Sequence, residues 1–477
     1  MDALSAPIDH RRRRLRLRDL GEGFRILRHA TERVMHLLAA CLGSTDPKVP
    51  DGLVVAGVGL VALSVVMLRL LIADDTESFV IAALAQGCLY VTALWLVLGR
   101  ASGRRTLVFI IAVALLTRAI ALFSPPTLSG DAFRYIWDGR VQAAGINPYR
   151  YVPADERLAL LRDAAIYPNV DKKEYARTIY PPVAQMIFLG VTRIGETLTA
   201  MKLAMFGFDL LTICVILALL QTEGVALARV LIYAWHPLPI WEFAGSGHVD
   251  AAAIAFMCLA MLAVGRGERA MAGVALAAGT LVKFFPLAIA PTLWRPWDWR
   301  LPAAFAVSVA VAYLPYLGVG SRIFGFLPDY GSEEGYRDGG GFFVVDLLRA
   351  LGIPSPSGAL FMVLALGIFI VLAIAIAFRR PWAKGAGAGQ ILLCASFLLL
   401  VSPHYAWYYA WVVPFLCRTV YVPLLYLTLA CFVLYIPELE TLGKEVHLWR
   451  WLYLGFAVLM GIDLLGRYRL LPLWRLT

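Results

Sequence analysis

The sequence predicts an all-α protein that crosses a membrane many times. Of its 477 residues, 60% are hydrophobic and only 16% are charged, and the mean hydropathy is +0.72. A soluble domain is far less apolar, so lipid is expected to be the solvent for most of the chain. Apolar runs of about 20 residues, the length that spans a bilayer as a helix, recur throughout and give about 12–14 crossings.

The first 50 residues are expected to stay on the cytoplasmic side. Residues 11–14 are four consecutive arginines, and residues 22–42 place apolar side chains at helical spacing with arginines between them. This pattern is typical of an amphipathic helix that lies on an anionic leaflet. A soluble or disordered regulatory tail is the alternative.

Two transmembrane helices are predicted within residues 51–104, and charged residues set their orientation. Residues 74–77 between these two helices are mostly acidic, whereas Arg100, Arg104 and Arg105 follow the second helix. The positive-inside rule places these arginines in the cytoplasm. The third apolar run, 105–123, therefore exits on the external face, which in a bacterial inner membrane is the periplasm.

A polar external loop, 124–180, follows this third run and is expected to contain short surface helices. Asp131, Tyr135 and Asp138 are spaced so that a helix would place them on one face, with Arg134 beside them and Arg140 a turn later. A lone acid where the chain leaves the membrane indicates chemistry, although aromatic side chains here also suit a membrane interface.

Two later apolar runs are interrupted by polar residues. His236, Glu242, His248 and Asp250 surround a Gly-Ser-Gly bend between two spans. Ionisable groups near hydrocarbon are costly and need partners or a water-filled cavity. Lys283 lies in the middle of the next run, 270–294, which is expected to break into two short helices; the alternative is that its side chain reaches the interface.

A third polar cluster lies at residues 402–405, where the run 388–417 is expected to break. His404 and Tyr405 stand there beside Pro403, and a proline interrupts a helix. The preceding external loop, 318–350, contains three consecutive glycines at 339–341 and is interpreted as a lid that orders on substrate binding.

Several classes of function lack a signature in this chain. Its seven cysteines are scattered without Cys-x-x-Cys spacing, which indicates small buried side chains rather than disulfides or a thiolate metal site. There is no Walker A, His-Glu-x-x-His or Gly-x-Ser-x-Gly sequence. The net charge of +10 follows the membrane topology, so no nucleic-acid partner is expected.

Five short motifs carry a resemblance to a known superfamily. They are WDG at 137–139, GINPY at 145–149, HPLPIWEFAGSGHVD at 236–250, KFFP at 283–286 and SPHY at 402–405. Over roughly residues 105–415 the chain resembles the GT-C superfamily of integral-membrane glycosyltransferases. Within it, the chain is similar to the family 87 polyprenyl-phosphate-mannose-dependent mannosyltransferases. Residues 105–350 would then form the catalytic module, and 351–477 would add C-terminal spans.

The resemblance implies a reaction and roles for particular residues. The chain would transfer a single hexose, mannose by family, from a polyprenyl-phosphate donor to a lipid or glycan acceptor. Asp131 would be the general base, and one base predicts inversion. The alternative is a double displacement, which a second carboxylate about 5–5.5 Å away, of Asp138 or Asp250, would permit. The donor phosphate and sugar would be bound by residues from the set Arg134, Arg140, Tyr180, Lys283, His404 and Tyr405. Further candidates for the substrate site are Tyr135, Asp138, His236, Glu242, His248 and Asp250.

The residues around Asp250 bear on whether the protein uses a metal ion. Asp250 corresponds to a second acidic motif of the oligosaccharyltransferase catalytic subunit. That enzyme has closely spaced acids for a metal where this chain has only His248 and Asp250. No cofactor or metal ligand is therefore expected, with a divalent ion as the alternative. The competing functions are a transporter or flippase for lipid-linked sugars and a non-catalytic scaffold.

Overall fold

The computed structural model describes residues 48–98, 103–378, 386–436, 438–441 and 444–467. The expected amphipathic helix, 22–42, and the arginine run before it lie outside the described residues.

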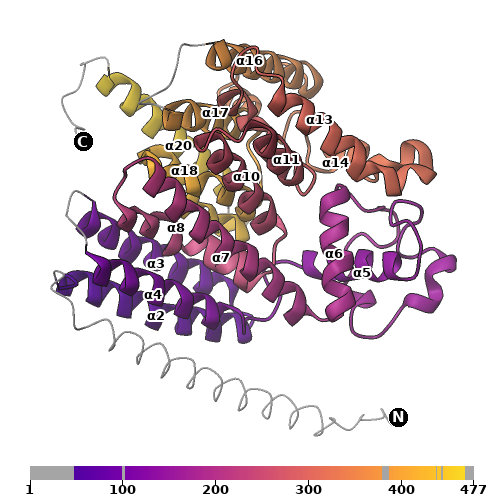
Figure 1. The fold of residues 1–477 in the computed structure, drawn as a ribbon, viewed down its shortest axis with the longest axis horizontal. Coiled ribbons are helices and arrows are strands. Elements are labelled where there is room, and N and C mark those ends of the chain that lie inside the picture. The colour runs from indigo at the N-terminus through magenta and orange to yellow at the C-terminus, as the bar shows by residue number, and fades with distance from the viewer. Residues whose placement is uncertain (1–47, 99–102, 379–385, 437, 442–443, 468–477) are drawn as a thin grey trace, which may run out of the picture.

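The described chain is built from helices, in agreement with the predicted all-α membrane fold (Figure 1). The first half contains α2 (Asp51–Ile72), α3 (Thr76–Val97), α4 (Arg104–Ala121), α5 (Asp131–Ala143), α6 (Pro182–Ile194), α7 (Leu198–Thr222), α8 (Leu231–Ala234), α9 (Pro237–Pro239), α10 (Asp250–Gly265) and α11 (Arg269–Thr280). The second half contains α12 (Ala290–Leu293), α13 (Arg300–Tyr313), α14 (Leu327–Glu333), α15 (Phe343–Ala350), α16 (Gly358–Phe378), α17 (Ala386–Val401), α18 (Val413–Arg418), α19 (Val422–Ala430) and α20 (Leu448–Arg467).

Short 3₁₀-helical segments and a π-helix connect these helices, and the described chain also contains a small sheet. The segments are η2 (Glu156–Leu161), η3 (Tyr167–Asn169), η4 (Leu227–Val230), η5 (Ile240–Gly245, a π-helix), η6 (Phe285–Ile289), η7 (Leu314–Phe324), η8 (Ala406–Val412) and η9 (Cys431–Tyr435). An antiparallel pair, β1 (Glu438–Thr441) and β2 (Lys444–His447), joins η9 to α20. The sequence analysis did not predict this hairpin.

Six described helical stretches are long and apolar enough to cross a bilayer. They are Asp51–Ile72, Thr76–Val97, Leu198–Thr222, Arg300–Glu333, Gly358–Phe378 and Leu448–Gly466. Shorter apolar helices of 10–17 residues add to them, among them Asp250–Gly265 and Gly387–Val401. The class of polytopic membrane protein is thereby confirmed. The count of 12–14 crossings stays a prediction, because a span made of two short helices has no single helix long enough to cross a bilayer.

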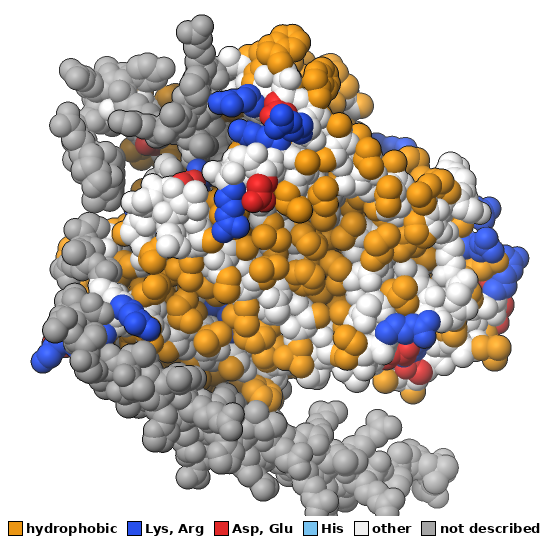
Figure 2. Space-filling view, in the orientation of Figure 1, with side chains coloured by type: hydrophobic (Ala, Val, Ile, Leu, Met, Phe, Trp, Pro, Cys, Tyr) orange, Lys and Arg blue, Asp and Glu red, His pale blue; other side chains and the backbone are white. Residues whose placement is uncertain are grey.

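The surface of the body is suited to lipid. Figure 2 shows hydrophobic side chains spread across the middle of one face, with charged side chains gathered toward its margins. Helix α16 illustrates this, because Val363 and Val371 on it are 67% and 68% exposed. An apolar surface of this extent is what an integral membrane protein presents to the bilayer.

The two predicted helix breaks are confirmed. Helix α11 ends at Thr280 and the chain turns through Lys283 before η6 and α12. Helix α17 ends at Val401, where Ser402 takes a positive φ of 50° ahead of Pro403. Both breaks place polar backbone and side chains at the edge of the same cavity, described below.

A buried ion pair, which the sequence analysis did not identify, joins α4 to α7. Arg118 of α4 donates from Nε to Asp209 of α7, and both side chains are fully buried. Tyr233 donates to the other oxygen of Asp209 at 2.7 Å, and Arg118 also donates to the carbonyl of Ala234 at 2.6 Å. Because each charge is neutralised and hydrogen-bonded, the pair fixes how α4, α7 and α8 pack.

The external loop forms a separate compact layer around α5 and α6 at one side of the body (Figure 1). The two helices approach closely at Gly139, where a Cβ would collide with the carbonyl oxygen of Phe188 and the side chain of Thr192. A lysine of the body, Lys202, reaches the start of this layer and donates to the carbonyls of Leu122 and Ser124, each at 2.8 Å. These contacts fix the chain that leads into α5.

Candidate functional site

A cavity of about 440 Å³ lies between the external loop and the two helix breaks. One part of its wall is polar and carries Asp131, Arg134, Asp171, Lys172, Arg177 and Lys283. Another part is apolar and aromatic, and is formed by Phe284, Phe285, Phe326, Leu327, Phe397, Val401, Tyr405, Trp407, Tyr408 and Trp411. The cavity therefore suits a ligand with an anionic head and an apolar body.

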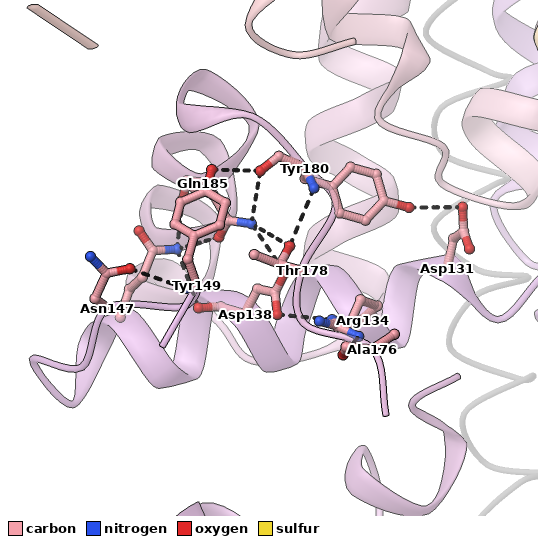
Figure 3. Close-up of polar contacts among 10 residues, drawn as sticks. Asp131, Arg134, Asp138, Asn147, Tyr149, Ala176, Thr178, Tyr180 and Gln185 are labelled. Carbon is pink, nitrogen blue, oxygen red and sulfur yellow. Dashed lines mark hydrogen bonds and ion pairs between the residues drawn. The ribbon is translucent and has the colours of Figure 1, made fainter. Parts of the chain in front are cut away.

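Asp131 lies at the first residue of α5, half-buried at the cavity wall. The hydroxyls of Tyr135 and Tyr180 both donate to its Oδ2, at 3.3 and 3.1 Å (Figure 3 shows the Tyr180 bond). Both hydrogen bonds use the same oxygen, so Oδ1 is available to a ligand in the cavity.

Tyr135 and Tyr180 are held as neutral donors. Burial raises the pKa of both phenols well above the ordinary value, and the Asp131 charge adds to the effect. Phe188 stacks on Tyr135 with ring centroids 4.5 Å apart. Tyr149, the last residue of the GINPY motif, is buried and donates to the carbonyl of Tyr180 at 2.7 Å. The aromatic side chains therefore position the carboxylate.

Asp138 does not share the cavity with Asp131, although both were expected on one helix face. Its carboxylate accepts from Arg134 Nε at 3.0 Å and from Gln185 Nε2 at 3.1 Å, and it is buried (Figure 3). Gln185 also donates to Thr178 at 2.8 Å. This network links α5, α6 and the segment before Tyr180. Asp138 therefore has a structural role that is separate from the cavity.

The two arginines of α5 have different surroundings. Arg134 lines the cavity but also donates from Nη1 to the carbonyl of Ala176 at 3.2 Å. Arg140 does not line the cavity, because its guanidinium is paired with Asp163 at 2.7 Å and with Glu196 at 2.8 Å. The structure therefore brings Arg134, and not Arg140, to the predicted site.

Lys283 lies in an apolar run, where a cation needs a counter-charge, and the structure pairs it with a carboxylate. Its Nζ donates to both carboxylate oxygens of Asp250, at 3.0 and 2.8 Å, and lies 4.5 Å from the centre of the Tyr408 ring. Asp250 is fully buried at the first residue of α10. Lys283 faces the cavity, whereas Asp250 lies behind it as the counter-charge.

The other residues of the Gly-Ser-Gly bend form the layer behind the cavity wall. His248 Nδ1 lies 2.9 Å from Glu242, which also accepts from Tyr435 at 2.6 Å. The His248 ring lies 4.4 Å from that of Trp407, a wall residue. His236 is remote from the wall: its Nε2 contacts Thr428 at 3.0 Å, and its Nδ1 accepts the Leu238 N–H that starts α9.

The break after α17 contributes one wall residue and one supporting residue. Tyr405 lines the cavity and stacks on Trp407 with centroids 4.7 Å apart. His404 lies outside the wall, with Nδ1 3.8 Å from Glu334, and burial lowers its pKa to about 4. His404 is therefore neutral at pH 7. Burial raises the pKa of Glu334, and hydrogen bonds to Tyr330 and Tyr405 partly offset that rise.

The loop predicted as a lid covers the cavity in this structure. Phe326 and Tyr330 line the cavity, and Tyr330 contacts the Tyr408 hydroxyl at 2.9 Å. Glu333 at the end of α14 pairs with Lys172 of the external loop at 2.7 Å. Gly325 permits the approach, because it takes a φ of 56° and a Cβ there would collide with the Thr178 carbonyl. Whether this loop moves on substrate binding stays a prediction.

Several wall residues were missed by the sequence analysis. Asp171, Lys172 and Arg177 come from one charged stretch, 171–177, that precedes Tyr180. The density of charge in this stretch was the available signal, but the pattern resembles an ordinary solvated loop. Trp407 and Tyr408, which follow the break at residues 402–405, were not among the predicted site residues. Among the described residues, no group of three or more His, Cys, Asp or Glu side chains is placed to hold a metal ion.

Comparison with known proteins gives one match. A family model described as "Alpha-(1->6)-mannopyranosyltransferase, N-terminal domain", of the MptA_B family, matches residues 52–297. The matched region contains α5, the external loop, the Gly-Ser-Gly bend and Lys283. Comparison with curated proteins and with solved structures gave no match.

Proposed function

We propose that this chain, which belongs to the alpha-(1->6)-mannopyranosyltransferase family, uses a polyprenyl-phosphate-linked mannose as its donor. The family is one of mannosyltransferases, and the helices are those of an integral membrane protein. The donor, the acceptor and the mechanism are inferred from the cavity. A single mannose would pass to a hydroxyl of a lipid or glycan acceptor.

The division of the cavity wall supports a lipid-phosphate donor. Three of the four described wall cations come from the external loop and the fourth, Lys283, from the break before η6. Aromatic and aliphatic side chains of the wall come largely from η6, α17 and η8. Phe285 and Trp411 stack within the apolar part, with centroids 5.3 Å apart. A prenyl chain would lie along this part while the phosphate meets the cations.

The proposal rests on one observation, the position of the Asp131 carboxylate at the cavity wall. Oδ1 would accept the proton of the acceptor hydroxyl while that oxygen attacks the anomeric carbon of mannose. The bond between this carbon and the phosphate oxygen breaks, and the lipid phosphate leaves with the bonding electrons. Cationic side chains stabilise the charge that develops on the departing phosphate.

The surroundings of Asp138 and Asp250, the two other acids predicted for the site, support one displacement with inversion. A double displacement needs a second carboxylate about 5–5.5 Å from the first, free to attack the sugar. Asp138 is held by Arg134 and Gln185, and Asp250 by Lys283. Neither carboxylate is available as a nucleophile in this arrangement. A β-linked donor would then give an α-linked product.

The predicted topology places this reaction on the external face. Arg104 and Arg105 begin α4, and α4 leads directly to the loop that carries Asp131. Since basic residues mark the cytoplasmic side, the end of α4 near Asp131 lies on the opposite side. In a bacterial inner membrane this side is the periplasm, where no nucleotide sugar is available and a lipid-linked donor suits the compartment.

The test is a transfer assay with purified protein in lipid. Radiolabelled polyprenyl-phosphate sugars would be supplied with a total membrane-lipid extract, and wild type compared with Asp131→Asn. Label in a new product only with wild type, and only from the mannose donor, is the expected result. If donor lipid crosses the bilayer and no sugar is transferred, the protein is a transporter or flippase instead, the function that broken helices also suit.

A further inference from the structure

We propose that Arg177 binds the donor phosphate, as the cation of the cavity wall that has no acidic partner. The proposal rests on the proposed function, because it assumes a lipid phosphate in the cavity. It goes beyond that function by assigning the phosphate to one side chain. Four described cations line the cavity: Arg134, Lys172, Arg177 and Lys283.

Three of these four cations are already neutralised. Arg134 pairs with Asp138 at 3.0 Å. Lys172 pairs with Glu333 at 2.7 Å. Lys283 binds both oxygens of Asp250. Each of these pairs must be weakened before its cation can give full charge to a ligand, which lowers the gain from binding.

Arg177 differs from the other three cations. Within the described part of the chain, its guanidinium forms no ion pair, and its Nε is a buried donor atom without a hydrogen-bond partner. A buried donor left unsatisfied is costly, and the cost is relieved when an acceptor arrives. The side chain is half-buried and faces the cavity, so a ligand that enters there can supply that acceptor.

The backbone around Arg177 is fixed before any ligand binds. The carbonyl of Ala176 accepts from Arg134 at 3.2 Å, and the hydroxyl of Thr178 accepts from Gln185 at 2.8 Å (Figure 3). Both neighbours are buried, whereas Arg177 is only half-buried. Arg177 is therefore held on a rigid segment with its guanidinium free, which reduces the entropy that binding would cost.

The chemistry of this site selects a phosphate with an apolar substituent. A planar guanidinium offers paired N–H donors that match two oxygens of a phosphate. The same cavity continues into the wall formed by Phe285, Phe397 and Trp411. A free inorganic phosphate would leave this apolar wall unused, and a neutral sugar would leave the guanidinium without an anion.

The test measures binding and needs no turnover. Wild type, Arg177→Gln and Arg177→Lys, each reconstituted as the full chain in lipid nanodiscs, would be titrated with farnesyl phosphate, farnesol and inorganic phosphate. Arg177→Gln should weaken farnesyl phosphate by about 10- to 100-fold, the range for loss of a charge-assisted hydrogen bond. Farnesol should bind all variants equally, and Arg177→Lys should lie between wild type and Arg177→Gln because it keeps the charge.

The matched control is Arg157→Gln. Arg157 belongs to the same external loop, but its side chain is 69% exposed and it does not line the cavity. The Arg157→Gln variant should bind farnesyl phosphate with the same affinity as wild type. Unchanged affinity in Arg177→Gln, or an equal loss for farnesol, would overturn the assignment. An equal loss for inorganic phosphate and farnesyl phosphate, with equal wild-type affinities, would refute the lipid part.

Failure of this proposal can be told apart from failure of the proposed function. If wild type transfers mannose but Arg177→Gln keeps its affinity for farnesyl phosphate, only the assignment of Arg177 is wrong. If wild type transfers no sugar and yet binds farnesyl phosphate through Arg177, the phosphate site is supported and the proposed transferase function is refuted. Should Arg177→Gln not fold, the Arg177→Lys titration decides, since that variant keeps the cation but loses the planar fork.

Discussion

Asp131→Asn should remove turnover and leave folding nearly intact, because the two properties depend on different features of this side chain. The replacement keeps the size of the group and one carbonyl oxygen. That oxygen can accept from Tyr135 and Tyr180, which now donate to Oδ2 at 3.3 and 3.1 Å. The loss of unfolding free energy should therefore stay below about 1 kcal/mol.

The effect on rate follows from the loss of basicity. An amide oxygen cannot take the proton of the acceptor hydroxyl at neutral pH, and a positioned general base contributes about 10²–10⁴-fold. Single-turnover transfer from a short-chain prenyl-phosphate mannose should fall by that factor. Binding of the donor should change little, because Asp131 is an anion and does not hold the phosphate.

Asp138→Asn is the matched control on the same helix. Asp138 is buried and pairs with Arg134 at 3.0 Å, so its loss leaves an unpaired cation. Removing one partner of a buried pair typically costs about 3–5 kcal/mol. Asp138→Asn should therefore lower the melting temperature in detergent, whereas Asp131→Asn should lower the rate. Transfer by Asp131→Asn at the wild-type rate would refute the assignment of the base.

Three further outcomes are expected. Lys283→Ala should lower the melting temperature, because Asp250 then stays buried without its cation, and adding Asp250→Ala should restore part of the loss; no recovery would contradict the pairing. Asp209→Ala should reduce the yield of monodisperse protein by leaving Arg118 charged and buried, and a normal yield would refute its structural role. For His404, the pKa is about 4 in the folded protein and about 6.5 unfolded. The unfolded state binds the proton first, so stability should fall by at most about 3 kcal/mol as pH drops from 6.5 to 4. His404→Gln should flatten this pH dependence, and an unchanged slope would exclude His404 as its source.

Features of this protein that depend on neighbouring residues could be predicted from the sequence. Helix class and the breaks at Lys283 and Pro403 follow from the order of residues nearby in the chain. Hydropathy, proline and glycine act over a few residues, and lipid makes their signals strong. These features were therefore predictable.

The assignment of charged residues to the cavity was much less predictable. Arg134 and Arg140 lie on one helix and carry the same charge, yet only Arg134 lines the cavity. Asp138 was expected beside Asp131, but contacts with Gln185 and Arg134 place it in a separate network. Spacing along a helix gives the direction of a side chain and says nothing about which partner meets it.

By itself the sequence determined the solvent of this protein, the positions where its helices break and the acid that follows the third apolar run. Only the tertiary structure decided which charges are neutralised and which are free. Lys283 meets Asp250 33 residues away, and Tyr435 meets Glu242 193 residues away. Within the described residues Arg177 forms no ion pair, because packing brought acids to the other three described cations of the wall instead. Helix formation and membrane insertion depend on local sums of side-chain properties, whereas ion pairing depends on contacts between segments that only the folded chain brings together.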